Sequence, residues 1–181
     1  KIKTMHVLTV DVLSDVLEVV RLTGTVFFTA DLGDPWSVIS PPTDILLRGM
    51  STRAECVTLF HIIAEGTCLF KTETGIQFSL GKGSVVIFPN GKSHLMCSDI
   101  HLNPVPLMQL LSFEMFKRPL NLKHGGNGPR TQFICGYLMC DQRFNPLLGA
   151  LPEVLILSPE GDKTTSIDAE NESFLLPNTI K

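Results

Sequence analysis

Apolar and polar residues alternate along the chain in short runs, and glycine or proline separates one run from the next. The runs richest in β-branched and aromatic residues are 25–30, 36–39, 57–64, 68–72, 77–80, 84–88, 131–140 and 154–157. Runs of this length, bounded by turn residues, predict β-strands. Many short strands at close spacing are typical of a small barrel or jelly roll, so we expect a mainly β protein.

Three segments have a helical pattern instead. In 11–23 the apolar residues fall on one face of a helix, Asp11 can cap its start and Gly24 can end it. Shorter helices are predicted over 107–116 and 146–151. The apolar face of the first helix consists of Leu13, Val16, Leu17 and Val20.

Glycine-containing turns mark where the predicted strands end. Glu65-Gly66 lies between two strands, and Pro89-Asn90-Gly91 ends the apolar run 84–88. Such sequences supply a fixed φ or a positive φ, so both are predicted to close hairpins. The glycine-rich segment 125–129 is predicted to be a flexible loop, either a lid on the barrel or a plain connection.

Composition narrows the class of protein. The 181 residues are enough for one domain with a core, and 44% are hydrophobic while 18% are charged. A net charge of −3 argues against nucleic-acid binding by this chain itself. No apolar run is long enough to span a membrane, and no export signal is evident. Five cysteines, an odd number without framework spacing, suit reduced thiols in the cytoplasm.

The stretch from Gly83 to His94 has a specific order: glycine, five residues, Pro-x-Gly, two residues, histidine. It resembles the second motif of the cupin superfamily, although Ser98 stands where that family usually has asparagine. Further segments, in order, resemble the N-terminal sensor domain of AraC-type transcription regulators: 11–17, 24–28, 35–38, 60–66, 125–128, 135–137 and 145–152.

The resemblance implies a cupin barrel, a double-stranded β-helix or jelly roll, with an N-terminal helix and short accessory helices. The sensor domain would cover 11–157, and 158–181 would be a polar tail or linker. It also implies a small-molecule effector, a possible homodimer and no catalysis. Such a domain acts on DNA through a C-terminal helix-turn-helix domain, but no such pattern follows Leu157, which suggests an excised domain or a truncated product.

His61, His94 and Cys135 are the candidate metal ligands. Strand alternation places His61 on the same face as Leu59 and Ile63, and His94 stands where cupins keep a metal-binding histidine. Two imidazoles and a thiolate would suit Zn²⁺. The alternative is that both histidines are hydrogen-bonded core residues and that Cys135 is a small apolar one.

Candidate effector-binding residues are His61, His94, Phe60, Phe88 and Trp36, with ordinary core packing as the alternative for the aromatic ones. A rival function is a metal-dependent cupin enzyme, an oxygenase or isomerase, that uses His61 and His94. The first cupin motif carries a His-x-His pair and a glutamate, and Leu59 precedes His61 at the place of the partner histidine, which counts against the enzyme. A dimerisation module with a filled barrel is the third possibility.

Overall fold

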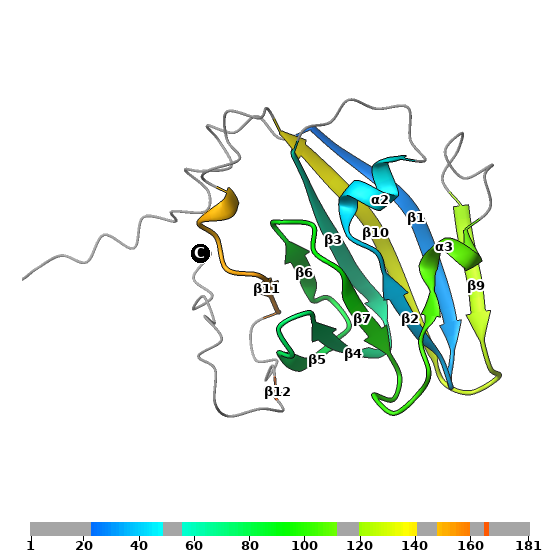
Figure 1. Ribbon diagram of the computed structural model, residues 1–181. Helices are drawn as coiled ribbons and strands as arrows, with labels where there is room; N and C mark the ends of the chain where they lie inside the picture. Colours follow the sequence, from blue (N-terminus) through cyan, green and yellow to red (C-terminus); the bar gives the residue numbers. More distant parts are fainter. Residues whose placement is uncertain (1–22, 49–55, 112–119, 141–147, 160–164, 167–181) are drawn as a thin grey trace, which may run out of the picture.

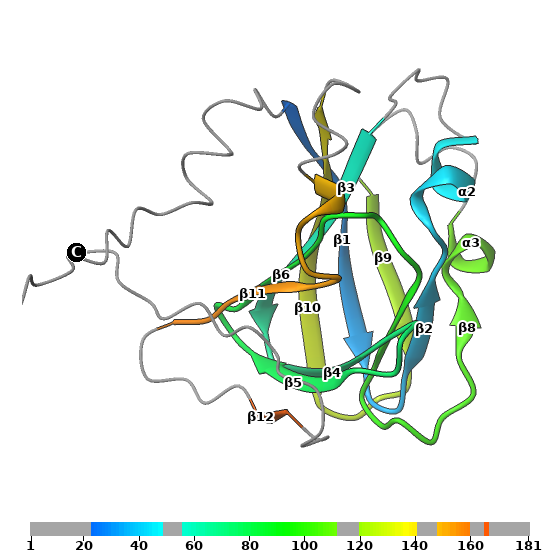
Figure 2. The same ribbon diagram turned by 60° about the vertical axis from the view of Figure 1, so that its left-hand side comes forward.

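Two β-sheets face each other and enclose the core (Figures 1 and 2). The computed structural model describes residues 23–48, 56–111, 120–140, 148–159 and 165–166. The predicted mainly β fold, a jelly-roll barrel, is confirmed in this part of the chain. Sheet A has the order β11 (Leu155–Leu157), β6 (Val85–Phe88), β3 (Cys56–Glu65), β10 (Arg130–Cys140), β1 (Thr23–Gly33) and β9 (Leu120–Gly125).

Sheet B packs against sheet A and contains mostly shorter strands. Neighbouring strands in both sheets are antiparallel, except for the parallel pairs β1–β9 and β2–β8. The second sheet has the order β12 (Thr165–Ser166), β5 (Gln77–Gly81), β4 (Thr67–Thr72), β7 (His94–Cys97), β2 (Ser37–Ser40) and β8 (Val105–Pro106). Because β12 pairs with β5, the chain beyond residue 157 returns to the edge of this sheet.

The two turns predicted to close hairpins instead carry the chain from one sheet to the other. Glu65-Gly66 joins β3 of sheet A to β4 of sheet B, and Pro89-Asn90-Gly91 joins β6 of sheet A to β7 of sheet B. Gly66 and Gly91 do have positive φ, as a tight change of direction requires. The hairpin prediction was wrong because turn residues show that the chain turns but not which strand it pairs with next.

Two short helices lie beside sheet B at one end of the barrel, α2 (Thr43–Arg48) and α3 (Leu107–Leu110) (Figure 2). The sequence did not predict α2, and α3 ends earlier than predicted because Leu111 is extended. The predicted helix over 11–23 lies outside the described residues except for Thr23, which begins β1. No helix within the described ranges is long and apolar enough to cross a membrane.

Aromatic and aliphatic side chains from both sheets fill the space between them. Phe70, Phe88 and Phe133 are at most 2% exposed. Trp36 packs edge-on against Phe133, with ring centroids 5.7 Å apart. Alternation along the strands accounts for this core, since every second residue of a strand faces the opposite sheet.

The glycine-rich segment after β9 is held tightly against the chain that follows β1. The amide of Gly126 donates to the carbonyl of Gly33 at 2.7 Å, and the amide of Gly128 donates to the carbonyl of Asp34 at 2.9 Å. The sequence predicted a flexible loop here, but backbone hydrogen bonds to residues 33 and 34 fix its position. A side chain at Gly126 would lie 2.5 Å from the Asp34 carbonyl oxygen, so glycine is needed for this close approach.

We expect Gly33→Ala to destabilise the fold by about 1–3 kcal/mol, the usual cost of forcing extra atoms into a packed site. A Cβ at Gly33 would lie 2.0 Å from the carbonyl oxygen of Gly126, which is backbone and cannot rotate away. Gly149→Ala is the matched control, since nothing lies within 4 Å of its Cβ position. Urea denaturation of both variants measures the effect, and equal midpoints would contradict the prediction.

Candidate functional site

His61, His94 and Cys135 form one hydrogen-bonded chain across the centre of the core. His61 on β3 and Cys135 on β10 are direct partners in the antiparallel register of sheet A. Nδ1 of His61 lies 2.9 Å from Sγ of Cys135. Nε2 of His61 lies 2.8 Å from Nε2 of His94, which comes from β7 in sheet B. The chain therefore links the two sheets through side chains that are at most 3% exposed.

The carbonyl of Lys92 fixes the direction of these hydrogen bonds. It lies 3.0 Å from Nδ1 of His94, and a carbonyl can only accept, so this nitrogen carries a proton and donates. In a neutral imidazole the other nitrogen, Nε2 of His94, is then an acceptor. His61 must donate to it from its own Nε2, which leaves Nδ1 of His61 as an acceptor for the thiol of Cys135. Each of the four ring nitrogens of His61 and His94, and the thiol of Cys135, therefore has a complementary partner.

Burial keeps all three groups uncharged. The pKa of His61 is lowered well below its usual value, first by burial and then by the neighbouring His94. Burial also lowers the pKa of His94 to about 4, although its hydrogen bond to Lys92 acts in the opposite direction. The pKa of the Cys135 thiol is raised by burial. An uncharged His94 is what this order of hydrogen bonds requires, because a proton added to Nε2 of His94 would place it opposite the N–H at Nε2 of His61.

The three predicted zinc ligands are neighbours, but their donor atoms do not converge on one point. Nδ1 of His61 faces Cys135, whereas its Nε2 faces His94. The two nitrogens of one imidazole point in divergent directions, so an ion bound to His61 reaches only one of the other two. The described residues contain no group of three His, Cys, Asp or Glu side chains that could hold a metal ion. This arrangement does not fit the predicted zinc site.

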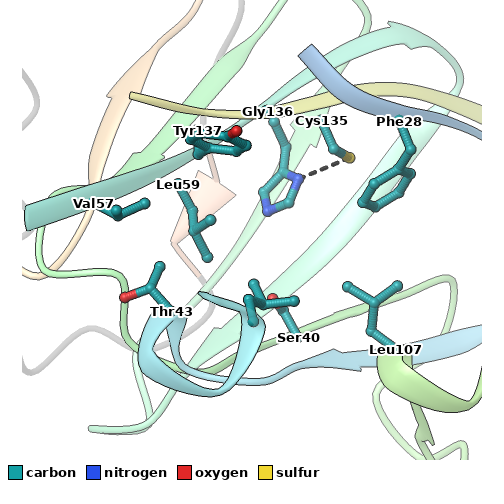
Figure 3. Close-up of a pocket in the computed structure, with 11 residues that line it drawn as sticks. Phe28, Ser40, Thr43, Val57, Leu59, Leu107, Cys135, Gly136 and Tyr137 are labelled. Carbon is teal, nitrogen blue, oxygen red and sulfur yellow. Dashed lines mark hydrogen bonds between the residues drawn. The ribbon is translucent and has the colours of Figure 1, made fainter. Parts of the chain in front are cut away.

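A cavity lies beside this chain, between the two sheets at the end where β10 finishes and β3 starts. Figure 3 shows Cys135 and Phe28 of sheet A on one side, and Ser40 and Leu107 on the other. The cavity has a volume of about 20 Å³, enough for little more than one water molecule. The lining consists of Phe28, Ser40, Thr43, Leu46, Val57, Leu59, His61, Leu107, Cys135, Gly136 and Tyr137.

The predicted effector-binding residues take different places relative to this cavity. His61 lines it. His94 lies behind His61, and Phe88 stacks on His94 with ring centroids 3.7 Å apart. Trp36 packs on Phe133 within the core, and Phe60 is half-buried on the face of β3 opposite to His61. The glycine-rich segment lies at the far end of the strands, where β9 ends and β10 starts, so it does not cover the cavity.

Several residues that line the cavity were not predicted from the sequence as ligand-binding residues. Val57 and Leu59 share the inward face of β3 with His61, so strand alternation alone could have found them. Ser40 and Thr43 had no such signal. They reach the cavity because β2 pairs with β7 and because α2 begins directly after Pro42, neither of which the local pattern predicts.

A cupin family model matches residues 11–171 of the chain, which is most of its length. The chain belongs to the cupin family. The resemblance of the Gly83–His94 motif to the second cupin motif is thereby confirmed at the level of the family. A search of curated proteins finds no match.

Two solved structures resemble this cupin. One is YhaK from Escherichia coli, with 11% sequence identity and a TM-score of 0.38. The other is ToxT from Vibrio cholerae with an unsaturated fatty acid bound, with 11% identity and a TM-score of 0.37. Each match covers 77% of this chain and 41% of the other, so the chain spans about two fifths of the length of each.

The buried histidines make the stability of this cupin depend on pH. Because burial lowers the pKa of His94 from 6.5 to about 4, the unfolded chain takes up its proton first as the solution is acidified. Stability is therefore complete above pH 6.5 and is lost as the pH falls from 6.5 towards about 4. From pH 7.5 to pH 5 we expect a loss of about 2 kcal/mol from His94, measured by urea denaturation.

His94→Gln removes this titrating group, so its stability should fall less steeply over the same pH range. The exposed His101→Gln variant should keep the wild-type slope. Parallel slopes for all three proteins would show that His94 is not buried in its neutral form.

We also expect the purified protein to contain well below one equivalent of zinc, iron or manganese. The reason is that the donor atoms of His61, His94 and Cys135 do not point toward one common position. Elemental analysis of untagged protein measures this, with His61→Ala and His94→Ala as controls. Stoichiometric metal that is lost in both variants would contradict the expectation and favour a metal centre.

Proposed function

We propose that this cupin domain is the effector-sensing domain of an AraC-type transcription regulator. A small molecule binds in the cavity between the sheets, and no chemical step takes place there. The observation that carries the proposal is a mostly apolar cavity between the two sheets that reaches His61, whose other ring nitrogen contacts His94. Small ligands typically occupy such mostly apolar cavities, with a few polar groups to orient them. The motif order along the chain supports the AraC-type assignment.

The size of the cavity determines how such a domain would respond. With room for little more than a water molecule, the site admits an effector only if lining side chains move. A ligand shifts an equilibrium by as much as its affinities for the two states differ. An effector that must open the cavity therefore stabilises the open arrangement over the closed one.

The turn between β6 and β7 offers a route from the cavity to the surface. Thr43 lines the cavity, and its backbone N–H donates to the carbonyl of Gly91 at 2.9 Å. The next residue, Lys92, accepts the hydrogen bond from His94, and its Nζ lies 4.0 Å from Oε1 of Glu153. Glu153 lies two residues before β11, so displacement of Thr43 or His61 would reach the segment that leads to the C-terminal part of the chain.

In the full regulator this segment would contact a helix-turn-helix domain or a second copy of the sensor. Effector binding would alter those contacts and so change DNA binding. The proposal places the protein in the cytoplasm as a homodimer, with the small molecule as its first partner and DNA as a partner only through the helix-turn-helix domain.

The test is a small-molecule screen by thermal shift on the purified chain, followed by calorimetry. We expect Val57→Trp to weaken binding of any hit at least about tenfold, because the larger side chain fills the cavity. Val26→Trp is the matched control, since Val26 is 44% exposed on β1. Hits that bind both variants equally would place the effector site elsewhere.

Amide hydrogen exchange tests the route. An effector should change exchange rates at Gly91 and Lys92 and around Glu153. Sizing chromatography of the same samples reports the oligomeric state. Binding that alters neither exchange at these residues nor the oligomeric state would overturn the sensing mechanism.

A further inference from the structure

The hydrogen-bond order of the core determines which polar group the cavity can accept. His61 and Cys135 both line the cavity, and the pair meets there at 2.9 Å. The Lys92 carbonyl can only accept, so donors and acceptors follow a fixed sequence through His94 and His61. At this pair, the group that a ligand can engage is consequently the lone pair on Nδ1 of His61, which the Cys135 thiol occupies.

A thiol is a weak hydrogen-bond donor, and a hydroxyl or amide N–H is a stronger one. A ligand with such a group can replace the thiol at Nδ1 of His61 without moving a proton elsewhere in the chain. Most of the remaining lining is hydrocarbon, including the buried side chains of Phe28, Leu59 and Leu107, which suits an uncharged body. The hydroxyl-bearing residues Ser40, Thr43 and Tyr137 complete it, and none of the lining residues other than His61 and Cys135 is ionisable near neutral pH.

A carboxylate fits this position poorly, because it only accepts hydrogen bonds. It would face the lone pair of Nδ1 unless His61 took up a second proton. Nε2 of His61 already carries the proton that it donates to His94, so a second proton on Nδ1 would make His61 a buried imidazolium. Burial acts against that charge, as the lowered pKa of His61 indicates.

We propose that the cavity selects uncharged, mainly apolar small molecules whose hydroxyl or N–H group donates to Nδ1 of His61, in preference to carboxylates of the same size. This inference rests on the proposed function and names the ligand class of the same site.

Three aromatic probes of similar size separate the possibilities: phenol, which donates; anisole, which only accepts; and benzoate, which is anionic. Binding to the purified wild-type chain is measured at pH 7.5 by protein NMR titration. The imidazole nitrogen signals of His61 report on its hydrogen bond. We expect a Kd for phenol about tenfold lower than for anisole or benzoate, with a shift at Nδ1 of His61.

Two substitutions of Cys135 provide the sharper comparison, since they change the competing donor and keep His61. In Cys135→Ala the acceptor on His61 loses its partner and the cavity gains the space of the sulfur atom. Phenol should therefore bind several-fold more tightly and gain clearly more than anisole, which profits from the space alone. In Cys135→Ser a stronger hydroxyl donor occupies the acceptor, so phenol should bind more weakly than in the wild type. If the alanine variant fails to fold, the serine variant alone still tests the order.

The outcomes distinguish the two proposals. If benzoate or anisole bound as tightly as phenol, and Val57→Trp weakened that binding, the donor preference would be overturned. The proposed sensing cavity would remain. Phenol affinity unchanged by both Cys135 substitutions would also overturn it. No binding by these probes or by any compound of the screen would overturn the donor preference and the proposed function together.

Discussion

The contact between His61 and His94 is the constraint on which much of this structure depends. One imidazole comes from sheet A and the other from sheet B, with their Nε2 atoms 2.8 Å apart in a core that otherwise consists mostly of hydrocarbon. A buried polar group without a partner costs roughly 1–3 kcal/mol, so neither ring can leave its place unless the other is satisfied. The pair therefore fixes how the two sheets face each other at the centre of the barrel.

The turn between β6 and β7 determines which of the two histidines donates the hydrogen bond and which accepts it. The Lys92 carbonyl holds the proton on Nδ1 of His94, and each further donor and acceptor follows from that one bond. The turn also receives the amide of Thr43 and the hydroxyl of Thr58, through the carbonyls of Gly91 and Pro89. One tight turn thus positions the histidine pair, the start of α2 and one wall of the cavity.

Tight packing makes the small cavity compatible with the proposed sensing role. Aromatic stacking of Phe88 on His94 and of Phe70 on Phe78 leaves little free volume around the hydrogen-bonded chain. A cavity of this size must rearrange to admit a ligand, and under the proposed mechanism a rearrangement at Thr43 or His61 would be transmitted by the hydrogen bonds to Gly91 and Lys92. The far end of the barrel cannot respond in this way, since residues 125–128 are bonded to residues 33 and 34.

Much of the local structure followed from short-range patterns. Period-two runs predicted most of the strands, the inward direction of His61 followed from alternation, and Gly91 has the positive φ its turn requires. The order of residues from Gly83 to His94 was enough to indicate the cupin family. The strand β9, the helix α2 and the short strands β8 and β12 were missed. The last three are too short to show a clear period, and in β9 only Leu120 and Leu122 alternate with polar residues.

The sequence by itself determined where the chain extends, where it turns and which side chains face inward, since these depend on residues two to four apart. Only the tertiary structure decided that the turns at Gly66 and Gly91 cross between sheets, and that β3 pairs with β10 so that His61 meets Cys135. It alone decided that the three candidate ligands form a hydrogen-bonded chain rather than a focus for one ion. These outcomes depend on strand register and on the direction of single hydrogen bonds between residues 33 and 74 positions apart, which no local pattern encodes.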